Sequence, residues 1–162
     1  MGYGYVVEIP PIQTLTFYNG IANRGKMVAP RFVDRIERNG IVTEVKPTIT
    51  LLEHMCKEQT LDDLFKCLEA AAVPSRTSRK FADLPVKIGC KTGTAQTGIP
   101  DTSDNAAFVC FAPKDDPQIA IAVYGEKAAH GNWLAPVAED ILEAYFEQVS
   151  ASNVYTYENQ VG

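Results

Sequence analysis

The sequence predicts a mixed α/β fold of the α+β type, in which helices pack against a three-stranded antiparallel sheet and a small β-hairpin is added. Apolar side chains alternate over residues 86–91, which is typical of a half-buried strand. Two apolar runs at 106–112 and 118–124 are joined by a short polar turn, as in an antiparallel pair. Apolar residues recur at helical spacing in 60–72 and 135–149. The three expected strands are those that carry Lys91, Ala106 and Gln118.

The first expected element is a helix that begins at Pro11 and ends by Gly25. Proline suits the first turn of a helix, where its missing N–H would have no partner in any case. The apolar positions from Ile12 to Ala22 have helical spacing, although Gly20 weakens the pattern. We expect this helix to pack behind the sheet in a structural role.

A β-hairpin is expected next, with strands at 32–36 and 41–45 on either side of Asn39-Gly40. Asn-Gly is the strongest short signal for a tight hairpin turn, because both residues accept a positive φ. We expect the hairpin to lie on the surface.

Residues 50–56 and 60–72 are both expected to be helical. Thr60 and Asp63 have the spacing of a capping box, with Asp in place of the usual Glu. The second segment carries an apolar face at helical spacing, formed by Leu61, Leu64, Phe65, Leu68, Ala71 and Ala72.

The last expected helix covers residues 135–149, with Pro136 in its first turn. Its expected buried stripe consists of Val137, Ile141, Leu142, Tyr145 and Phe146. The pattern ends at Ser150, so we expect residues 1–149 to form the structural unit and residues 150–162 to form a tail.

The composition excludes several classes of protein. A hydrophobic content of 46% with 22% charged residues is that of an ordinary soluble globular protein, and 162 residues suit one domain. The net charge is -5 and no Lys/Arg run occurs, so we expect no nucleic-acid partner. No apolar run reaches the roughly 18 residues that span a bilayer, and no signal peptide is evident. We therefore expect a soluble chain without a transmembrane segment.

The four cysteines do not suggest a disulfide scaffold or a metal site. Cys56 and Cys67 are too far apart to be bridged within one helix, since they are separated by three turns. Cys90 and Cys110 are expected on neighbouring strands, where a bridge is conceivable, but we favour buried thiols. No spacing suits zinc, and we predict neither a metal nor a cofactor.

The end of the first strand, Lys91-Thr92-Gly93-Thr94, brings a cation, two hydroxyls and a bare backbone to one place. An edge strand of this kind could bind a carboxylate through Lys91, Thr92 and Thr94. Gly93 would let a substrate backbone lie close, because nothing projects from its Cα. Lys-Thr-Gly is also the third motif of the serine acyl-transfer enzymes, beside Ser-x-x-Lys and Ser-Asp-Asn.

A longer series of motifs makes this signal specific. In order, the chain contains Gly2-Tyr3-Gly4-Tyr5, Pro11-Ile12-Gln13, Ile21-Ala22-Asn23-Arg24-Gly25, Pro30-Arg31-Phe32-Val33, Lys91 to Gln96, Ala107 to Pro113 and Ala135-Pro136-Val137-Ala138. With these motifs the chain resembles the C-terminal part of the transpeptidase domain of class B penicillin-binding proteins, over residues 2 to about 147.

The resemblance implies a partial β-lactamase/transpeptidase-like domain from a peptidoglycan D,D-transpeptidase, which cross-links stem peptides and binds β-lactams. It assigns catalytic roles to Lys91 and Thr94 and substrate binding to Thr92, Gly93 and Thr94. Lys91 would hold a second serine, the two threonine hydroxyls would bind the substrate carboxylate, and the Thr94 N–H would donate to the oxyanion. The parent protein would act at the extracytoplasmic face of the bacterial membrane.

The nucleophile of that family is not found in this sequence. No Ser-x-x-Lys occurs, and Thr77 to Lys80 has the spacing without a serine. Ser103-Asp104-Asn105 follows Lys91 where the family places its middle motif earlier, so we interpret it as a loop coincidence. We therefore expect a fragment that is inactive alone. Its expected partner is the missing N-terminal half of the transpeptidase domain. Without that half, apolar surface and strand edges would be exposed, so we also expect the fragment to self-associate.

The sequence differs from the usual family pattern at two positions near the site. Cys90 stands before the lysine where glycine is usual, and Asn105 stands where relatives often have histidine. His54 and His130 are weak candidates for a base.

One alternative function is a non-catalytic binding or interaction module, and the other is a β-lactamase or β-lactam-sensor domain. Whether the parent serves elongation or division is left open.

Overall fold

The computed structural model describes residues 8–72, 81 and 84–158. In chain order the elements are α1 (Pro11–Ala22), β1 (Met27–Val28), β2 (Arg35–Arg38), β3 (Ile41–Val45), β4 (Thr50–Leu52), α2 (Glu58–Ala71), β5 (Gly89–Ala95), β6 (Asn105–Ala112), β7 (Ile119–Gly125), the 3-10 helix η2 (Gly131–Leu134) and α3 (Ala135–Glu158). The Gly2–Tyr5 motif and the Thr77–Lys80 segment lie outside the described residues.

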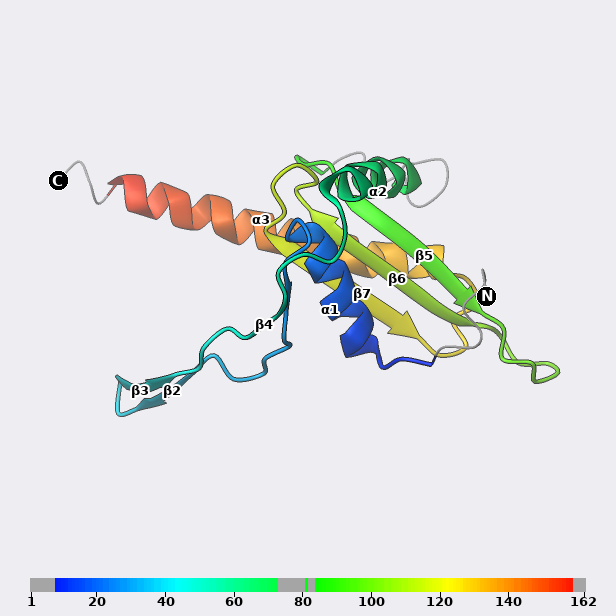
Figure 1. The fold of residues 1–162 in the computed structure, drawn as a ribbon, viewed down its shortest axis with the longest axis horizontal. Helices are drawn as coiled ribbons and strands as arrows, with labels where there is room; N and C mark the ends of the chain where they lie inside the picture. The colour runs from blue at the N-terminus through cyan, green and yellow to red at the C-terminus, as the bar shows by residue number, and fades with distance from the viewer. Residues whose placement is uncertain (1–7, 73–80, 82–83, 159–162) are drawn as a thin grey trace.

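The central element is the antiparallel sheet β5-β6-β7, which confirms the predicted strands and their order. Cys90 of β5 lies opposite Cys110 of β6, which in turn lies opposite Ile121 of β7. Figure 1 shows α1 and α2 on one face of this sheet and α3 on the other. The fold class predicted from the sequence is therefore confirmed.

Each face of the sheet has its own core, because successive side chains of a strand point to opposite faces. The core beneath α3 contains Ile88, Cys90, Phe108, Cys110, Ile121, Ala138 and Leu142. The core beneath α1 and α2 contains Ile21, Leu61, Phe65, Leu68 and Phe111. In the second core the ring centroid of Phe65 lies 5.1 Å from that of Phe111, which joins α2 to the middle strand.

Helix α1 begins at Pro11 as predicted and packs on β6 and β7. Gly25, with a φ of +93°, donates its N–H to the carbonyl of Gly20 at 2.8 Å and so ends the helix. Gly20 weakens the helix but allows close packing, since a Cβ there would lie 2.5 Å from Met55 Sδ.

Residues 26–53, which we call the arm, project from the body of the molecule (Figure 1). The predicted hairpin forms its tip, but β2 begins at Arg35 rather than at residue 32. The turn residues Asn39 and Gly40 have φ of 53° and 76°, as a tight hairpin turn requires. Eight apolar side chains of the arm are at least 47% exposed: Phe32, Val33, Ile41, Val42, Val45, Ile49, Leu51 and Leu52.

The prediction of a helix at 50–56 is wrong. Residues 50–52 form β4, which pairs antiparallel with β1 at Met27 and Val28. Ile49 and Thr50 are β-branched, and such residues favour extended backbone once a partner strand is available. The partner lies more than 20 positions earlier in the chain, so no local pattern could reveal it.

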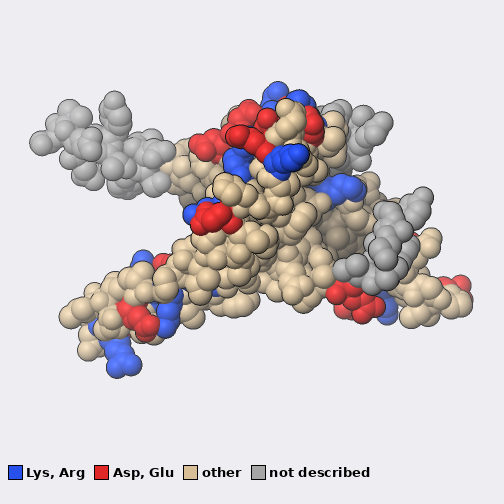
Figure 2. Space-filling view, viewed as in Figure 1, with Lys and Arg blue, Asp and Glu red and all other residues tan. Residues whose placement is uncertain are grey.

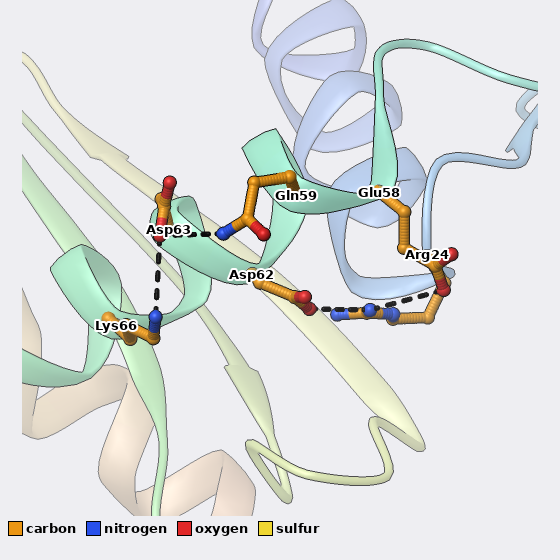
Figure 3. Close-up of polar contacts among 6 residues, drawn as sticks. All are labelled: Arg24, Glu58, Gln59, Asp62, Asp63 and Lys66. Atoms are coloured by element: carbon orange, nitrogen blue, oxygen red, sulfur yellow. Dashed lines mark hydrogen bonds and ion pairs between the residues drawn. The ribbon is translucent and has the colours of Figure 1, made fainter.

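Helix α2 confirms the second predicted helix, and Leu61, Phe65 and Leu68 are buried as expected. The predicted capping box is wrong, because the helix begins at Glu58 and Thr60 lies inside it. Figure 3 shows instead that the side chain of Arg24, from the turn after α1, reaches the start of α2. Its Nη2 lies 2.7 Å from Asp62 Oδ1 and 3.7 Å from Glu58 Oε1.

Helix α3 begins at the predicted place but continues nine residues past Val149, to Glu158. The predicted buried stripe is partly wrong. Leu142 is fully buried, but Val137 and Ile141 are 48% and 41% exposed, and Ala135 and Ala138 contact the sheet in their place. Small side chains let the helix approach the strands closely, so Ala135 and Ala138 lie in the core beside the sheet.

Charged side chains of both signs are mixed over α2 and along the arm on the face shown in Figure 2. Several form exposed pairs within the arm, such as Arg31 with Asp34 and Lys26 with Glu53. Within residues 8–72, 81 and 84–158, no helix has the length and apolar character needed to cross a bilayer.

Candidate functional site

The Lys91-Thr92-Gly93-Thr94 sequence lies wholly within β5, at the edge of the three-stranded sheet. Only one side of β5 pairs with a strand in the described part of the chain, and that strand is β6. Lys91, Gly93 and Thr94 are exposed, and Thr92 is half-buried. The structure therefore places the four predicted site residues on one accessible strand edge.

The four residues divide between the two faces of the sheet. Lys91 and Gly93 lie opposite Val109 and Ala107, on the face that carries α1 and α2. Thr92 and Thr94 alternate with them and lie on the side of η2 and α3. A ligand that uses both the lysine and the threonine hydroxyls must therefore lie along the strand edge, where both faces can be reached.

The Lys91 ammonium donates a hydrogen bond to the carbonyl of Thr92. Lysine has three donors and four rotatable side-chain bonds, so this contact leaves two N–H groups for other partners. The cation is thus available at the strand edge.

Gly93 has room for a small side chain beside the middle strand. A Cβ added there would lie 3.5 Å from Ala107 Cβ, an ordinary van der Waals distance, so packing does not require glycine at this position. The absence of a side chain instead leaves the backbone of β5 uncovered on the Lys91 face.

Gly131 of η2 covers the opposite side of Gly93. A Cβ on Gly131 would lie 2.5 Å from the carbonyl oxygens of both Gly93 and Ala107, which no side chain could tolerate. The Gly131 N–H also donates a long hydrogen bond of 3.4 Å to Thr94 Oγ1. Sequence reasoning missed this residue, since a single glycine in a loop carries no signal of a contact 37 positions away.

His130 and Trp133 flank Gly131 and are both exposed. Their rings meet edge to face with centroids 5.7 Å apart, and Trp133 is 64% exposed. His54, predicted to lie in a helix, instead lies in an irregular exposed segment before α2.

The Ser103-Asp104-Asn105 sequence has a loop role in the structure. Asn105 lies opposite Ala95 at the far end of β5. Its Oδ1 accepts a hydrogen bond from the Lys127 N–H at 3.0 Å, and the Asp104 carbonyl accepts one from the Ala129 N–H at 3.0 Å. These contacts join the start of β6 to the turn after β7.

A carboxylate fixes the start of the site strand. Glu69 of α2 accepts hydrogen bonds from Lys87 Nζ at 3.1 Å and from Lys114 Nζ at 2.9 Å. The hydrogen bonds from Lys114 and then Lys87 lower the pKa of Glu69, while those to Asp115 and Glu69 raise the pKa of Lys114. The charges therefore link α2, the segment before β5 and the β6–β7 turn.

Cys90 and Cys110 are buried side by side and are not joined in a disulfide, which confirms the favoured interpretation. Burial raises the pKa of the Cys110 thiol to about 12, and the neighbouring Cys90 adds to this. Cys56 and Cys67 are exposed, so the expectation of burial is wrong for those two. Within the described ranges, no three His, Cys, Asp or Glu side chains are grouped to hold a metal ion.

Comparison with known proteins gives the family. The family described as penicillin binding protein transpeptidase domain matches residues 1–144. Among curated relatives, penicillin-binding protein 2B of Streptococcus pneumoniae is 29% identical over 157 residues, which cover 88% of this chain and 23% of that protein. Peptidoglycan D,D-transpeptidase PbpA of Mycolicibacterium smegmatis is also 29% identical, with 89% of this chain and 30% of that protein covered.

Solved structures agree with this. Penicillin-binding protein 2B of S. pneumoniae matches with a TM-score of 0.71 and 29% identity, over 85% of this chain and 25% of that one. Penicillin-binding protein A of M. tuberculosis, as its ceftriaxone acyl-enzyme complex, matches with a TM-score of 0.72 and 25% identity, over 83% of this chain and 32% of that one. The chain thus spans about a quarter of the relatives that it matches, and it belongs to the penicillin-binding protein transpeptidase domain family.

Proposed function

We propose that this chain supplies the Lys-Thr-Gly-Thr wall of the active site of a peptidoglycan D,D-transpeptidase that also binds β-lactams. The observation that carries the proposal is the position of Lys91 to Thr94 on an accessible strand edge, where Gly93 adds no side chain to cover the backbone. Stem peptides belong to the peptidoglycan of the cell wall, so the whole protein would act at the extracytoplasmic face of the membrane.

Each site residue has a role in this proposal. Lys91 holds the second serine of the family by a charge-assisted hydrogen bond and attracts the substrate carboxylate. The Thr92 and Thr94 hydroxyls donate to that carboxylate, and the Thr94 N–H donates to the oxyanion of the tetrahedral intermediate. Gly93 lets the substrate backbone lie against β5.

The nucleophile comes from outside this chain in our proposal. An acyl-serine reaction needs an activated hydroxyl, and the sequence has no Ser-x-x-Lys. In the whole enzyme the serine oxygen would attack the carbonyl of the penultimate D-Ala and release the terminal D-Ala as the amine. An amine of a neighbouring stem peptide would then attack the acyl-enzyme and release the serine. The chain alone performs neither step.

The test has two arms, read with a fluorescent penicillin and intact mass spectrometry. The isolated chain is expected to form no covalent adduct. A chimera in which this chain replaces the matching residues of S. pneumoniae penicillin-binding protein 2B is expected to be labelled, and Lys91→Ala in the chimera should slow labelling about 100-fold. Lys66→Ala, at an exposed position on α2, is the control and should have no effect.

The absence of the nucleophile motif also favours a second candidate, a non-catalytic module that binds cell-wall peptides. The two candidates differ in the chimera, because a module without a catalytic wall should leave it unlabelled although it is folded. An adduct on the isolated chain would contradict both, since it would place a reactive nucleophile among these 162 residues.

A further inference from the structure

We propose that Asn105 is a positioning residue, which acts through residues 126–131 to orient the hydroxyl of Thr94 as a hydrogen-bond donor toward a ligand carboxylate. The proposal rests on the proposed function in one respect, namely that Thr94 contacts a carboxylate. Asn105 itself contacts no ligand in this scheme. We refer to residues 126–131 as the positioning loop.

The first step is the contact between Gly131 and Thr94. A hydroxyl has one donor and two acceptor sites and rotates to suit its surroundings. Because the Gly131 N–H donates to Thr94 Oγ1, one acceptor site is filled and the hydroxyl proton turns away from the loop. Thr94 is exposed, so that proton points to the strand edge, where an anion needs a donor.

The second step is the fixed place of Gly131. Its Cα lies so close to β5 and β6 that a Cβ would be 2.5 Å from Gly93 O and Ala107 O and 2.8 Å from Gly93 N. The loop is therefore seated directly on the backbone of the site strand. Any displacement of the loop moves the N–H that faces Thr94.

The third step is the conformation of the positioning loop. Lys127 and Ala129 have φ of 55° and 60°, in the left-handed region that residues with a Cβ disfavour. Such a conformation persists only where other contacts fix it. Two contacts do so here: Asn105 Oδ1 accepts from the Lys127 N–H, and the Asp104 carbonyl accepts from the Ala129 N–H.

Of these two contacts, only that of Asn105 uses a side chain, so mutation can remove it without changing the backbone of β6. Without the amide oxygen, Lys127 can leave the left-handed region, and Gly131 is no longer held against Thr94. Asn105, which stands where relatives often have histidine, thus positions the loop through its side-chain oxygen.

The test uses the 162-residue chain with Asn105→Ala, Asn105→Asp and, as a control in the neighbouring loop, Thr102→Ala. Hydrogen exchange of the Gly131 amide and the χ1 rotamer of Thr94 from three-bond couplings report the geometry. NMR titration with N-acetyl-D-alanyl-D-alanine and with its C-terminal amide reports carboxylate recognition. We expect Asn105→Ala to speed Gly131 exchange at least tenfold, to mix the Thr94 rotamers and to remove most of the preference for the acid.

Asn105→Asp keeps the acceptor oxygen and should restore the exchange rate and the rotamer, whereas Thr102→Ala should change nothing. The geometry is the readout for Asp, because its added charge weakens acid binding on its own. Unchanged Gly131 exchange and Thr94 rotamer in Asn105→Ala would overturn the proposal, whatever the ligand data. Equal binding of acid and amide by the wild-type chain would count instead against the carboxylate role of the wall, while the geometric readouts would still decide the role of Asn105.

Discussion

Glu69 and Lys114 are 45 positions apart in the sequence, yet Lys114 Nζ lies 2.9 Å from Glu69 Oε2. The same carboxylate binds Lys87, two residues before β5 begins. Helix α2 is thereby tied to the strand that carries Lys91, at the end opposite the positioning loop. The site strand is held at both ends by polar contacts.

Glu69→Gln is expected to lower stability by about 1 kcal/mol near neutral pH, since it weakens two partly exposed ion pairs. The effect depends on pH. The pKa of Glu69 is lowered in the folded chain, so its contribution is full above the ordinary value of 4.5 and is lost as the pH falls through the folded value. The pKa of Lys114 is raised, so its contribution is lost only as the pH rises above 10.5.

Urea unfolding of both proteins at about pH 3, 7 and 9 checks this prediction. The two stability curves should converge at acid pH and stay apart at the other two values. Asp63→Asn removes an exposed pair with Lys66 and serves as the control, with a change within about 0.5 kcal/mol. A constant difference at all three pH values would contradict the assignment.

Phe111→Ala is expected to destabilise the chain by about 3–5 kcal/mol. Phe111 is fully buried on the middle strand and contacts Phe65 of α2, so the substitution leaves a cavity between helix and sheet. Phe32→Ala is the matched control, because Phe32 in the arm is 90% exposed. Thermal unfolding followed by circular dichroism should show a large loss of Tm for the first variant and little change for the second.

Gly93→Ala and Gly131→Ala are expected to differ sharply in stability. An alanine at 93 has room beside Ala107, so the free energy of unfolding should stay within about 0.5 kcal/mol of the wild type. An alanine at 131 would overlap two backbone carbonyls, and we expect a loss of more than about 2 kcal/mol. Chemical denaturation measures both, and a strongly destabilised Gly93→Ala variant would show that the fold itself needs this glycine.

Two of the four thiols are expected to react in the folded chain. Cys56 and Cys67 are exposed, whereas Cys110 is buried and its pKa of about 12 keeps it protonated at pH 8. Iodoacetamide at pH 8 followed by intact mass spectrometry should give two adducts, and four in denaturant. Rapid addition of a third group under native conditions would indicate that the sheet opens readily near Cys90.

The isolated chain is expected to self-associate. The arm exposes apolar side chains on both strands of its hairpin, and the outer edge of β5 pairs with no strand among the residues that the structure describes. Sedimentation velocity over a wide concentration range should show a rising average mass. Ile41→Lys together with Val45→Lys should reduce it, and a clean monomer for the wild type at high concentration would contradict this prediction.

The sequence was sufficient where local pattern and tertiary structure agree. Asn39-Gly40 requires its turn, and the apolar runs of β6 and β7 can be buried only inside a sheet. The Lys91 motif was placed correctly on a strand because alternation continues into it. Residues 50–52 were misassigned because their strand depends on a partner near Met27, and pairing of this kind has no local period.

The site was predictable in its composition but not in its support. Lys91 to Thr94 form a contiguous motif, whereas Glu69, Asn105 and Gly131 contribute through contacts made between distant parts of the chain. In the sequence, Gly131 and Asn105 cannot be told apart from ordinary loop residues, because their contacts depend on distant parts of the chain. Only the tertiary fold brings these residues close to the site strand.

The placement of α3 beneath the sheet, on the face opposite Lys91 and Gly93, has a practical consequence. In Figure 1 its far end extends well beyond the strands. A biotin or dye attached there would lie away from β5, so a sensor surface could carry the molecule with the proposed ligand-binding edge facing the flow. Attachment through the exposed thiols of Cys56 or Cys67 would instead crowd the α2 side, and the two immobilisation chemistries should give different apparent affinities for the same peptide.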